Sequence, residues 1–229
     1  MGSIIEEVKI DRLFRILAVG RSGVGKSSLI NRILGIDVAP VSHLVVGQSD
    51  IRREYVSPRN KNFVLHDSEG FEPGDLTKFN IVCEFILERS KMKNPEDRVH
   101  GIWLCTETPP AGGRVFERGD ELLVKFAHEN KVPLVIVFTQ YDRLLRTKKA
   151  EIEEDEGILN PDPARYEEDA RIAYERCLYL VRRTIEGWLK VPMPYYANVS
   201  VRPRYPAEVG DLVRVTVDVI KNGLKTRGP

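Results

Sequence analysis

Eight consecutive residues near the amino terminus have the types and the spacing that binding of a polyphosphate needs. Gly20 to Ser27 reads Gly-Arg-Ser-Gly-Val-Gly-Lys-Ser and fits the pattern G-x-x-x-x-G-K-[ST]. Its glycines let the backbone turn its amide groups toward an anion, and Lys26 adds a full positive charge. Ser27 supplies a hydroxyl where a magnesium ion bridging two phosphates needs an oxygen ligand. The candidate phosphate-binding residues are Ser22, Gly23, Val24, Gly25, Lys26, Ser27 and Ser28.

The surroundings of this segment favour a phosphate site over a glycine-rich turn that merely caps a helix. An apolar run, Leu13–Val19, precedes it, and Ser28–Leu34 continues with helical periodicity. A helix that begins at Lys26 would aim the positive end of its dipole at the same anion.

A second candidate follows the apolar segment Phe63–His66, where Asp67-Ser68-Glu69-Gly70 reads D-x-x-G. At the carboxyl end of a strand beside the phosphate loop, Asp67 could hold magnesium through water. Gly70 could offer its amide to a terminal phosphate, because it has no side chain in the way. The same four residues also fit an ordinary tight turn.

A third candidate ends the apolar segment Leu134–Phe138, where Thr139-Gln140-Tyr141-Asp142 reads T-Q-x-D. A carboxylate here accepts two hydrogen bonds from the N1–H and the exocyclic amine of guanine, a pair of donors that adenine lacks. Asp142 therefore favours guanine, although it could instead cap the following turn. Near the next strand end, Ser200 and Val201 could supply a backbone amide for the guanine carbonyl.

These candidates need an alternating set of strands and helices to position them. The apolar patterns predict such a set, and with it an α/β fold of the P-loop NTPase type, with a mainly parallel six-stranded sheet covered by helices on both faces. Turn residues between the second and third strands predict one antiparallel edge strand. The predicted strands are Leu13–Val19, Ile51–Ser57, Phe63–His66, Val99–Cys105, Leu134–Phe138 and Tyr195–Val199, and the predicted helices are Lys26–Leu34, Phe79–Lys91, Phe116–Asn130, Arg165–Lys190 and Gly210–Asn222.

Length and composition favour one domain over residues 1–229, with a charged insertion at about 143–163. The 35 Lys and Arg residues nearly balance the 34 Asp and Glu residues, which argues against a nucleic-acid partner. We expect no integral membrane segment and a cytoplasmic location with reduced cysteines. Trp103 and Trp188 lie in apolar patterns and are expected in the core.

In their order and spacing, these motifs resemble those of the G-domain GTPases over nearly the whole chain. Gly20–Ser27 is similar to the first motif of that family, Asp67–Gly70 to the third, Thr139–Asp142 to a threonine variant of the fourth, and Ser200–Arg202 to the fifth. Threonine in the fourth motif and an apolar residue after D-x-x-G resemble the septin, Era and immunity-associated branch. The stretch Val99–Cys105 is similar to the fourth strand of fungal G-domain proteins.

The chain departs from the family pattern at three places. No threonine precedes the second strand, so Ser49 is the expected third metal-binding residue, with Ser42 as the second choice. Gln140 stands where the family usually has a lysine whose stem lies along the base. Phe71 follows the D-x-x-G glycine where Ras-like members have a glutamine, so no catalytic residue is assigned.

The resemblance implies that GTP or GDP binds with Mg²⁺, and that slow GTP hydrolysis switches the loops around 40–50 and 69–75. A phenyl ring at Phe71 cannot orient water, so we expect a weak GTP-dependent homodimer through Thr108–Arg114 and Gln48–Arg53. An effector protein is expected, but the sequence does not identify it. A second hypothesis is a nucleotide-binding scaffold without turnover, favoured by Phe71 and the missing threonine. A third, an ATP-dependent kinase, is weakened by Asp142.

Overall fold

The fold is seen in a computed structural model that describes residues 12–36, 50–58, 61–70, 76–108, 115–202 and 206–226. Its centre is a six-stranded sheet in the order β2-β3-β1-β4-β5-β6. All neighbouring strands are parallel except β2, which pairs antiparallel with β3 at one edge. This confirms the predicted sheet and its antiparallel edge strand. The strands are β1 Phe14–Val19, β2 Tyr55–Val56, β3 Phe63–Asp67, β4 Gly101–Glu107, β5 Leu134–Thr139 and β6 Tyr195–Asn198.

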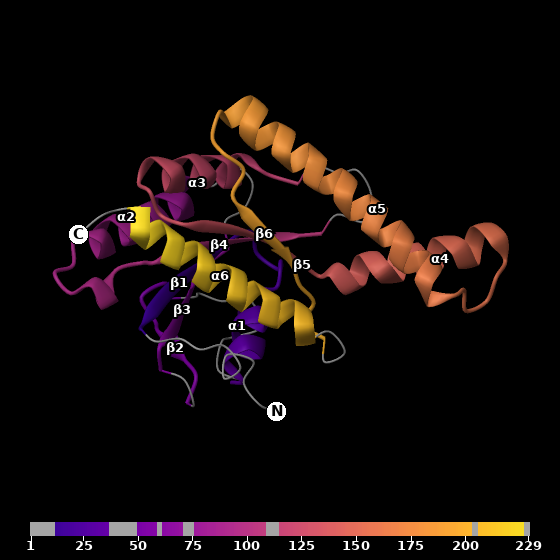
Figure 1. The fold of residues 1–229 in the computed structure, drawn as a ribbon, viewed down its shortest axis with the longest axis horizontal. Coiled ribbons are helices and arrows are strands. Elements are labelled where there is room, and N and C mark those ends of the chain that lie inside the picture. The colour runs from indigo at the N-terminus through magenta and orange to yellow at the C-terminus, as the bar shows by residue number, and fades with distance from the viewer. Residues whose placement is uncertain are drawn as a thin grey trace.

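Helices cover both faces of the sheet, as predicted (Figure 1). The helices are α1 Lys26–Leu34, α2 Leu76–Ser90, η2 Pro95–Asp97, α3 Arg118–Glu129, α4 Tyr141–Glu156, α5 Pro163–Arg182, η3 Arg183–Leu189 and α6 Pro206–Thr226. Because successive residues of a strand point to opposite faces of the sheet, β1 contributes side chains to two separate cores. Ile16 and Ala18 pack with α1 and α6, whereas Leu17 and Val19 pack with α2, α3 and α5.

The second predicted strand, Ile51–Ser57, is mostly wrong. Only Tyr55 and Val56 pair with β3, because a turn occupies the preceding residues. The backbone N–H of Arg53 donates to the carbonyl oxygen of Asp50 at 2.9 Å, and that of Arg52 donates to the Asp50 carboxylate. Such local hydrogen bonds compete with strand pairing. The other predicted strands were correct to within two residues at each end.

The predicted helix Arg165–Lys190 is two differently wound segments. The α-helix α5 ends at Arg182 and a π-helix, η3, continues to Leu189. Trp103 is fully buried, and its indole N–H donates to Oγ1 of Thr216 at 2.8 Å. Trp188, which we expected in the core, is 76% exposed. That prediction was wrong because it assumed α-helical winding through the whole segment.

The predicted insertion at 143–163 is mostly helical. The helix α4 runs through it to Glu156, and α5 begins at Pro163 after Asp162 accepts a hydrogen bond from the amide of Ala164. The two helices pack on each other. Figure 1 shows α4 and the amino-terminal end of α5 projecting beyond the sheet, whereas the rest of α5 runs back toward α3. Among the described residues, none of the helices is both long enough and apolar enough to cross a membrane.

Candidate functional site

The loop between β1 and α1 has a backbone that only glycine adopts readily. Gly20, Gly23 and Gly25 have φ angles of 147°, 78° and 95°, all in the region that strains residues with a side chain. Gly20 also has no room for a side chain, because a Cβ there would lie 2.1 Å from the carbonyl oxygen of Cys105. The glycines of the motif therefore fix the shape of the loop, and the helix α1 begins directly after Gly25.

Lys26 folds back across this loop. Its ammonium group donates to the carbonyl oxygens of Gly20 and Arg21, at 3.0 Å each, and the residue is only 7% exposed. The charge is thereby held against the loop, and an anion bound by the loop would also meet the positive amino end of α1.

The hydroxyl of Ser27 donates to Oδ2 of Asp67 at 2.6 Å. Asp67 is the last residue of β3 and is fully buried, so the third motif lies beside the first motif. A hydroxyl and a carboxylate oxygen at this distance match the oxygen ligands that Mg²⁺ prefers, with water and phosphate completing its shell. Among the described residues, no group of three or more His, Cys, Asp or Glu side chains could hold a metal ion by itself.

Gly70 lies against the phosphate loop. A Cβ on Gly70 would stand 2.3 Å from the backbone nitrogen of Ser22, so only glycine fits at this contact. The ammonium of Lys78, in the first turn of α2, donates to the Gly70 carbonyl oxygen at 3.2 Å and pairs with Glu69 at 3.1 Å. The segment after β3 is thus packed directly on the loop that precedes α1.

The end of β5 supports the same loop from the other side. The buried Oγ1 of Thr139 lies 2.6 Å from the carbonyl oxygen of Val24 and 3.1 Å from that of Thr106. The side-chain amide of Gln140 donates to the carbonyl oxygen of Gly23 at 3.3 Å. Thr139 and Gln140 therefore stabilise the phosphate loop through their side chains. The motif alone did not reveal this role.

Asp142 lies in the first turn of α4 and is 8% exposed. Its Oδ1 accepts a hydrogen bond from the hydroxyl of Ser200 at 2.9 Å. Its Oδ2 accepts from Nε of Arg202 at 2.9 Å and from Nη2 of Arg146 at 3.2 Å. These contacts join the fourth and fifth motifs and orient the carboxylate at the mouth of the sheet.

A second carboxylate, that of Glu208, contacts the fifth motif at Ser200. Oε2 of Glu208, in α6, accepts a hydrogen bond from the backbone N–H of Ser200 at 2.8 Å. Burial raises the pKa of Glu208 to about 7, and the nearby charge of Asp142 acts in the same direction. The Ser200 amide is thus already used, which leaves the amide of Val201 as the candidate for a base carbonyl.

The structure therefore brings together the predicted site residues that it describes. Ser22, Gly23, Val24, Gly25, Lys26, Ser27 and Ser28 form the loop and the first turn of α1, and Asp67, Gly70, Thr139, Gln140, Asp142, Ser200 and Val201 surround it at the ends of β3, β5 and β6. Ser49, Ser42, Phe71 and Arg114 lie outside the described residues. Sequence reasoning missed Arg146, Lys78 and Glu208 and gave no role to the side chain of Arg202, because helix and loop residues of these types carry no motif.

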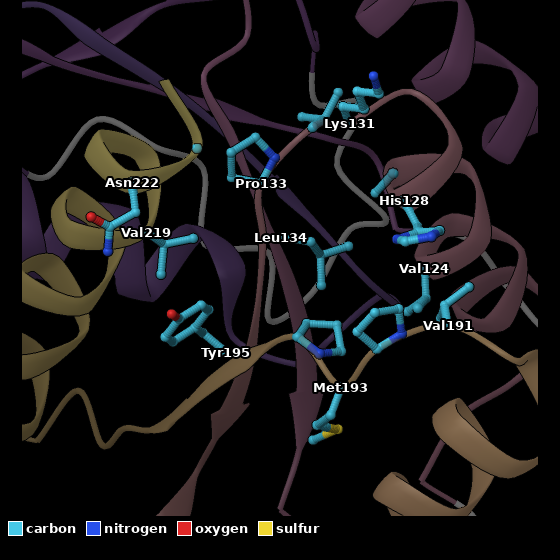
Figure 2. Close-up of a pocket in the computed structure, with 15 residues that line it drawn as sticks. Val124, His128, Lys131, Pro133, Leu134, Val191, Met193, Tyr195, Val219 and Asn222 are labelled. Atoms are coloured by element: carbon cyan, nitrogen blue, oxygen red, sulfur yellow. The ribbon is translucent and has the colours of Figure 1, made fainter. Parts of the chain in front are cut away.

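An apolar pocket of about 430 Å³ lies at the opposite edge of the sheet. Figure 2 shows Leu134, at the start of β5, between Tyr195 and Val219 on one side and Val191 and His128 on the other. Ligands of open α/β sheets bind at the carboxyl ends of the strands, whereas this pocket lies at the amino ends. It is therefore separate from the candidate site.

Comparison with known proteins agrees with this geometry. A family model described as 50S ribosome-binding GTPase matches residues 15–140, which is more than half of the chain. The chain belongs to this GTPase family. The family match covers β1 to the end of β5, and so includes the phosphate loop, Asp67, Gly70, Thr139 and Gln140.

Relatives and solved structures are similar to different extents. GTPase Der of Clostridium novyi is 28% identical over 148 residues, which cover 65% of this chain and 32% of Der. The chain thus spans about a third of the length of this curated relative. Solved structures of other proteins share the fold. Toc33 from Arabidopsis thaliana in complex with Mg²⁺ and GMPPNP has a TM-score of 0.57 at 14% sequence identity. The match covers 96% of this chain and 90% of Toc33. Era in complex with MgGDPNP and 16S ribosomal RNA nucleotides has a TM-score of 0.55 at 15% identity, covering 91% of this chain and 57% of Era.

Proposed function

We propose that this GTPase-family chain binds GTP and GDP with Mg²⁺ and acts as a nucleotide-dependent switch with slow GTP hydrolysis. The observation that carries the proposal is the contact between Ser27 and Asp67 at 2.6 Å, next in the chain to Lys26, whose ammonium group binds the phosphate loop. A cation ligand pair next to a phosphate-binding loop is the arrangement that phosphoryl transfer requires. Asp142, at the far end of the same edge, supplies the contact that selects guanine.

In this proposal, different residues of the site bind the phosphates and the metal ion. Lys26 and the amides of the loop would hold the β- and γ-phosphates, and Gly70 would offer its amide to the γ-phosphate. Ser27 and Asp67 would hold Mg²⁺, which neutralises charge that develops on the phosphates. Ser49 remains the proposed third ligand on the basis of its position in the sequence.

Turnover needs a group that orients water, and no described residue at the site is assigned this role. Phe71 offers neither donor nor acceptor, so slow intrinsic hydrolysis follows. Membership of a GTPase family supports turnover, whereas Phe71 and the missing threonine support the scaffold without turnover. We favour the GTPase, because the loop, Ser27 and Asp67 are all in place.

The direct experiment identifies the nucleotide released from protein that was purified without added ligand, and then times GTP hydrolysis with Mg²⁺ and with EDTA. We expect GDP or GTP, and slow hydrolysis only with Mg²⁺. Lys26→Ala should weaken GTP and GDP binding by about a hundredfold or more, because it removes the loop's buried charge. Lys91→Ala is the control, since Lys91 is exposed just after α2 and outside the phosphate loop, and its loss should leave binding nearly unchanged.

Different failures have different meanings. Equal binding of GTP by wild type and Lys26→Ala would remove the phosphate assignment. Tight binding of GTP without hydrolysis under any condition would leave the scaffold. Preference for ATP would support the kinase hypothesis instead.

We also propose a protein effector and a weak homodimer that GTP and Mg²⁺ favour, through Thr108–Arg114 and Gln48–Arg53, segments that lie partly outside the described residues. The nearly balanced charge of the chain supports a protein partner over nucleic acid, although Era has been solved with ribosomal RNA. Specific activity that rises with protein concentration, and a larger sedimentation coefficient in a GTP analogue than in GDP, would support the dimer. Flat activity and a monomer in both nucleotides would exclude it. The single-domain boundary, the cytoplasmic location and the placement near septins and fungal G-domain proteins stay predictions.

A further inference from the structure

An exposed tryptophan marks a surface that the proposed nucleotide site does not use. Trp188 is 76% exposed, although apolar side chains of its size usually lie inside a protein. It belongs to η3, a π-helix, and π-helical turns are rare and often occur at functional sites.

The winding of η3 explains why Trp188 points outward. Cys177, Val181 and Ile185 form a buried stripe with a spacing of four residues. If α-helical winding of about 100° per residue continued, Trp188 would fall on this stripe and Leu189 would drift off it. The wider π turn reverses the drift, so Leu189 stays buried at 4% exposure and Trp188 turns to the outside. The local structure therefore presents the indole ring to solvent.

Trp188 forms one wall of an open groove between η3 and the start of α3. The groove has a volume of about 590 Å³ and is lined by Arg118, Glu121, Leu180, Arg183, Thr184 and Trp188. η3 packs against α3, and Figure 1 shows the carboxyl-terminal part of α5, which η3 continues, next to α3. Leu180 is also 39% exposed, so the groove offers two apolar side chains.

The charges at the rim of this groove are mostly positive. Arg183 forms no ion pair with any described residue and lies over the ring of Tyr179 at 5.9 Å. Arg118 pairs with Glu121 at 3.6 Å, yet the Arg118 side chain remains 65% exposed. Glu121 also lines the groove, but its side chain is only 11% exposed. The accessible charges are therefore the two guanidinium groups.

We propose that this groove binds an acidic segment of a partner protein that inserts one apolar side chain against Trp188 and Leu180. Trp and Arg are among the residues that most often dominate binding energy at protein interfaces, and both types line this groove. Carboxylates of the partner pair with Arg118 and Arg183 in the geometry that guanidinium groups favour. None of the residues that line the groove is among the proposed nucleotide-binding residues.

The surroundings favour a peptide over a nucleic acid. A nucleic acid needs several basic contacts along its backbone, whereas only two arginines are among the residues that line the groove. One apolar anchor and two arginines instead match a short acidic segment.

The test uses the fluorescence of Trp188, because Trp103 is fully buried and shielded from a quencher such as acrylamide. Four short peptides are titrated: acidic with one leucine, acidic without an apolar residue, basic with one leucine, and neutral with one leucine. A single-stranded RNA oligonucleotide is the fifth ligand. We expect only the acidic peptide with leucine to protect Trp188 from quenching and shift its emission to shorter wavelength, and Trp188→Phe to remove the signal.

Charge variants decide between specific docking and general attraction. Arg183→Glu should weaken binding of the acidic leucine peptide by about tenfold or more. Arg176→Glu is the matched control, because Arg176 is exposed on α5 but does not line the groove, and its effect should stay below about twofold. Both variants should keep the wild-type melting temperature.

Three results would overturn the proposal. They are equal binding of the basic or neutral peptide, RNA binding to which Arg176 and Arg183 contribute equally, and no protection of Trp188 by any peptide up to about 1 mM.

Discussion

The hydroxyl of Ser200 donates a hydrogen bond to Oδ1 of Asp142 at 2.9 Å across 58 residues of sequence. The contact is buried, and Arg202 engages the other carboxylate oxygen at 2.9 Å. Both oxygens of Asp142 are thereby held in a defined direction at the mouth of the sheet. A carboxylate that is oriented before the base arrives loses less entropy when guanine binds.

Asp142→Asn should reverse the base preference of the site. The change replaces one acceptor oxygen with a donor, which opposes the exocyclic amine of guanine and suits the oxygen of xanthine. We expect at least about a tenfold loss in GTP affinity and a gain in binding of xanthosine triphosphate, measured by calorimetry. Ser200→Ala is the matched control: it keeps both acceptors, so it should lower GTP affinity without changing the base preference. A variant that binds GTP as tightly as wild type would place the base elsewhere.

Ser27→Ala should uncouple GTP binding from magnesium. The hydroxyl that contacts Asp67 at 2.6 Å is lost, and with it one proposed oxygen ligand. The ratio of GTP affinities with Mg²⁺ and with EDTA should fall by about tenfold relative to wild type. Ser28→Ala removes the neighbouring hydroxyl and should keep the wild-type ratio even if affinity changes. An unaltered ratio in Ser27→Ala would contradict the metal assignment.

Gly70→Ala should distort the phosphate loop. Its Cβ would lie 2.3 Å from the backbone nitrogen of Ser22, and a backbone atom cannot move away without shifting the loop. We expect GTP affinity to fall by about tenfold or more, with a stability loss of about 1–3 kcal/mol in urea unfolding. Gly187→Ala is the control, because no atom lies within 4 Å of the Cβ position and φ is not positive there. Normal nucleotide binding by Gly70→Ala would show that this contact is not needed.

His66 should make the fold sensitive to mild acid. It is fully buried next to Asp67, and its Nε2 accepts a hydrogen bond from Arg15 at 2.9 Å. Because arginine only donates, the proton lies on Nδ1, which donates to the carbonyl oxygen of Ile51 at 2.8 Å. Burial lowers the pKa of His66 to about 4, and the charges of Arg15 and Arg89 act in the same direction.

Because the pKa of His66 is lowered in the folded state, the free energy of unfolding should decrease in mild acid. The unfolded chain binds the proton with a pKa near 6.5, so the stability contributed by neutral His66 is complete above that pH and is lost as the pH falls toward 4. The loss amounts to at most roughly 3 kcal/mol. Urea unfolding at pH 7.5 and pH 5 should show it, and His66→Gln should flatten the pH dependence. His128→Gln, at an exposed position, should keep the wild-type slope. Equal slopes in wild type and His66→Gln would refute the assignment.

The sequence by itself determined the elements that carry the site. The predicted helix Lys26–Leu34 was correct at both ends, and the antiparallel edge strand was correct in direction. These features depend on local properties: glycines with positive φ, a continuous apolar strand, and a helical period that follows. Because each motif lies at the carboxyl end of a strand, a parallel sheet brings all of them to one edge.

The tertiary structure alone decided which side chains meet at that edge and which leave the core. Thr139 supports Val24 across 115 residues, and Asp142 meets Ser200, because strand order places β5 next to β6 and its end beside the loop. Trp188 lies outside the core because η3 is wound more widely than an α-helix, and this winding keeps Ile185 and Leu189 in the core. Sequence patterns record local conformation, whereas these contacts depend on chain segments that only folding brings together.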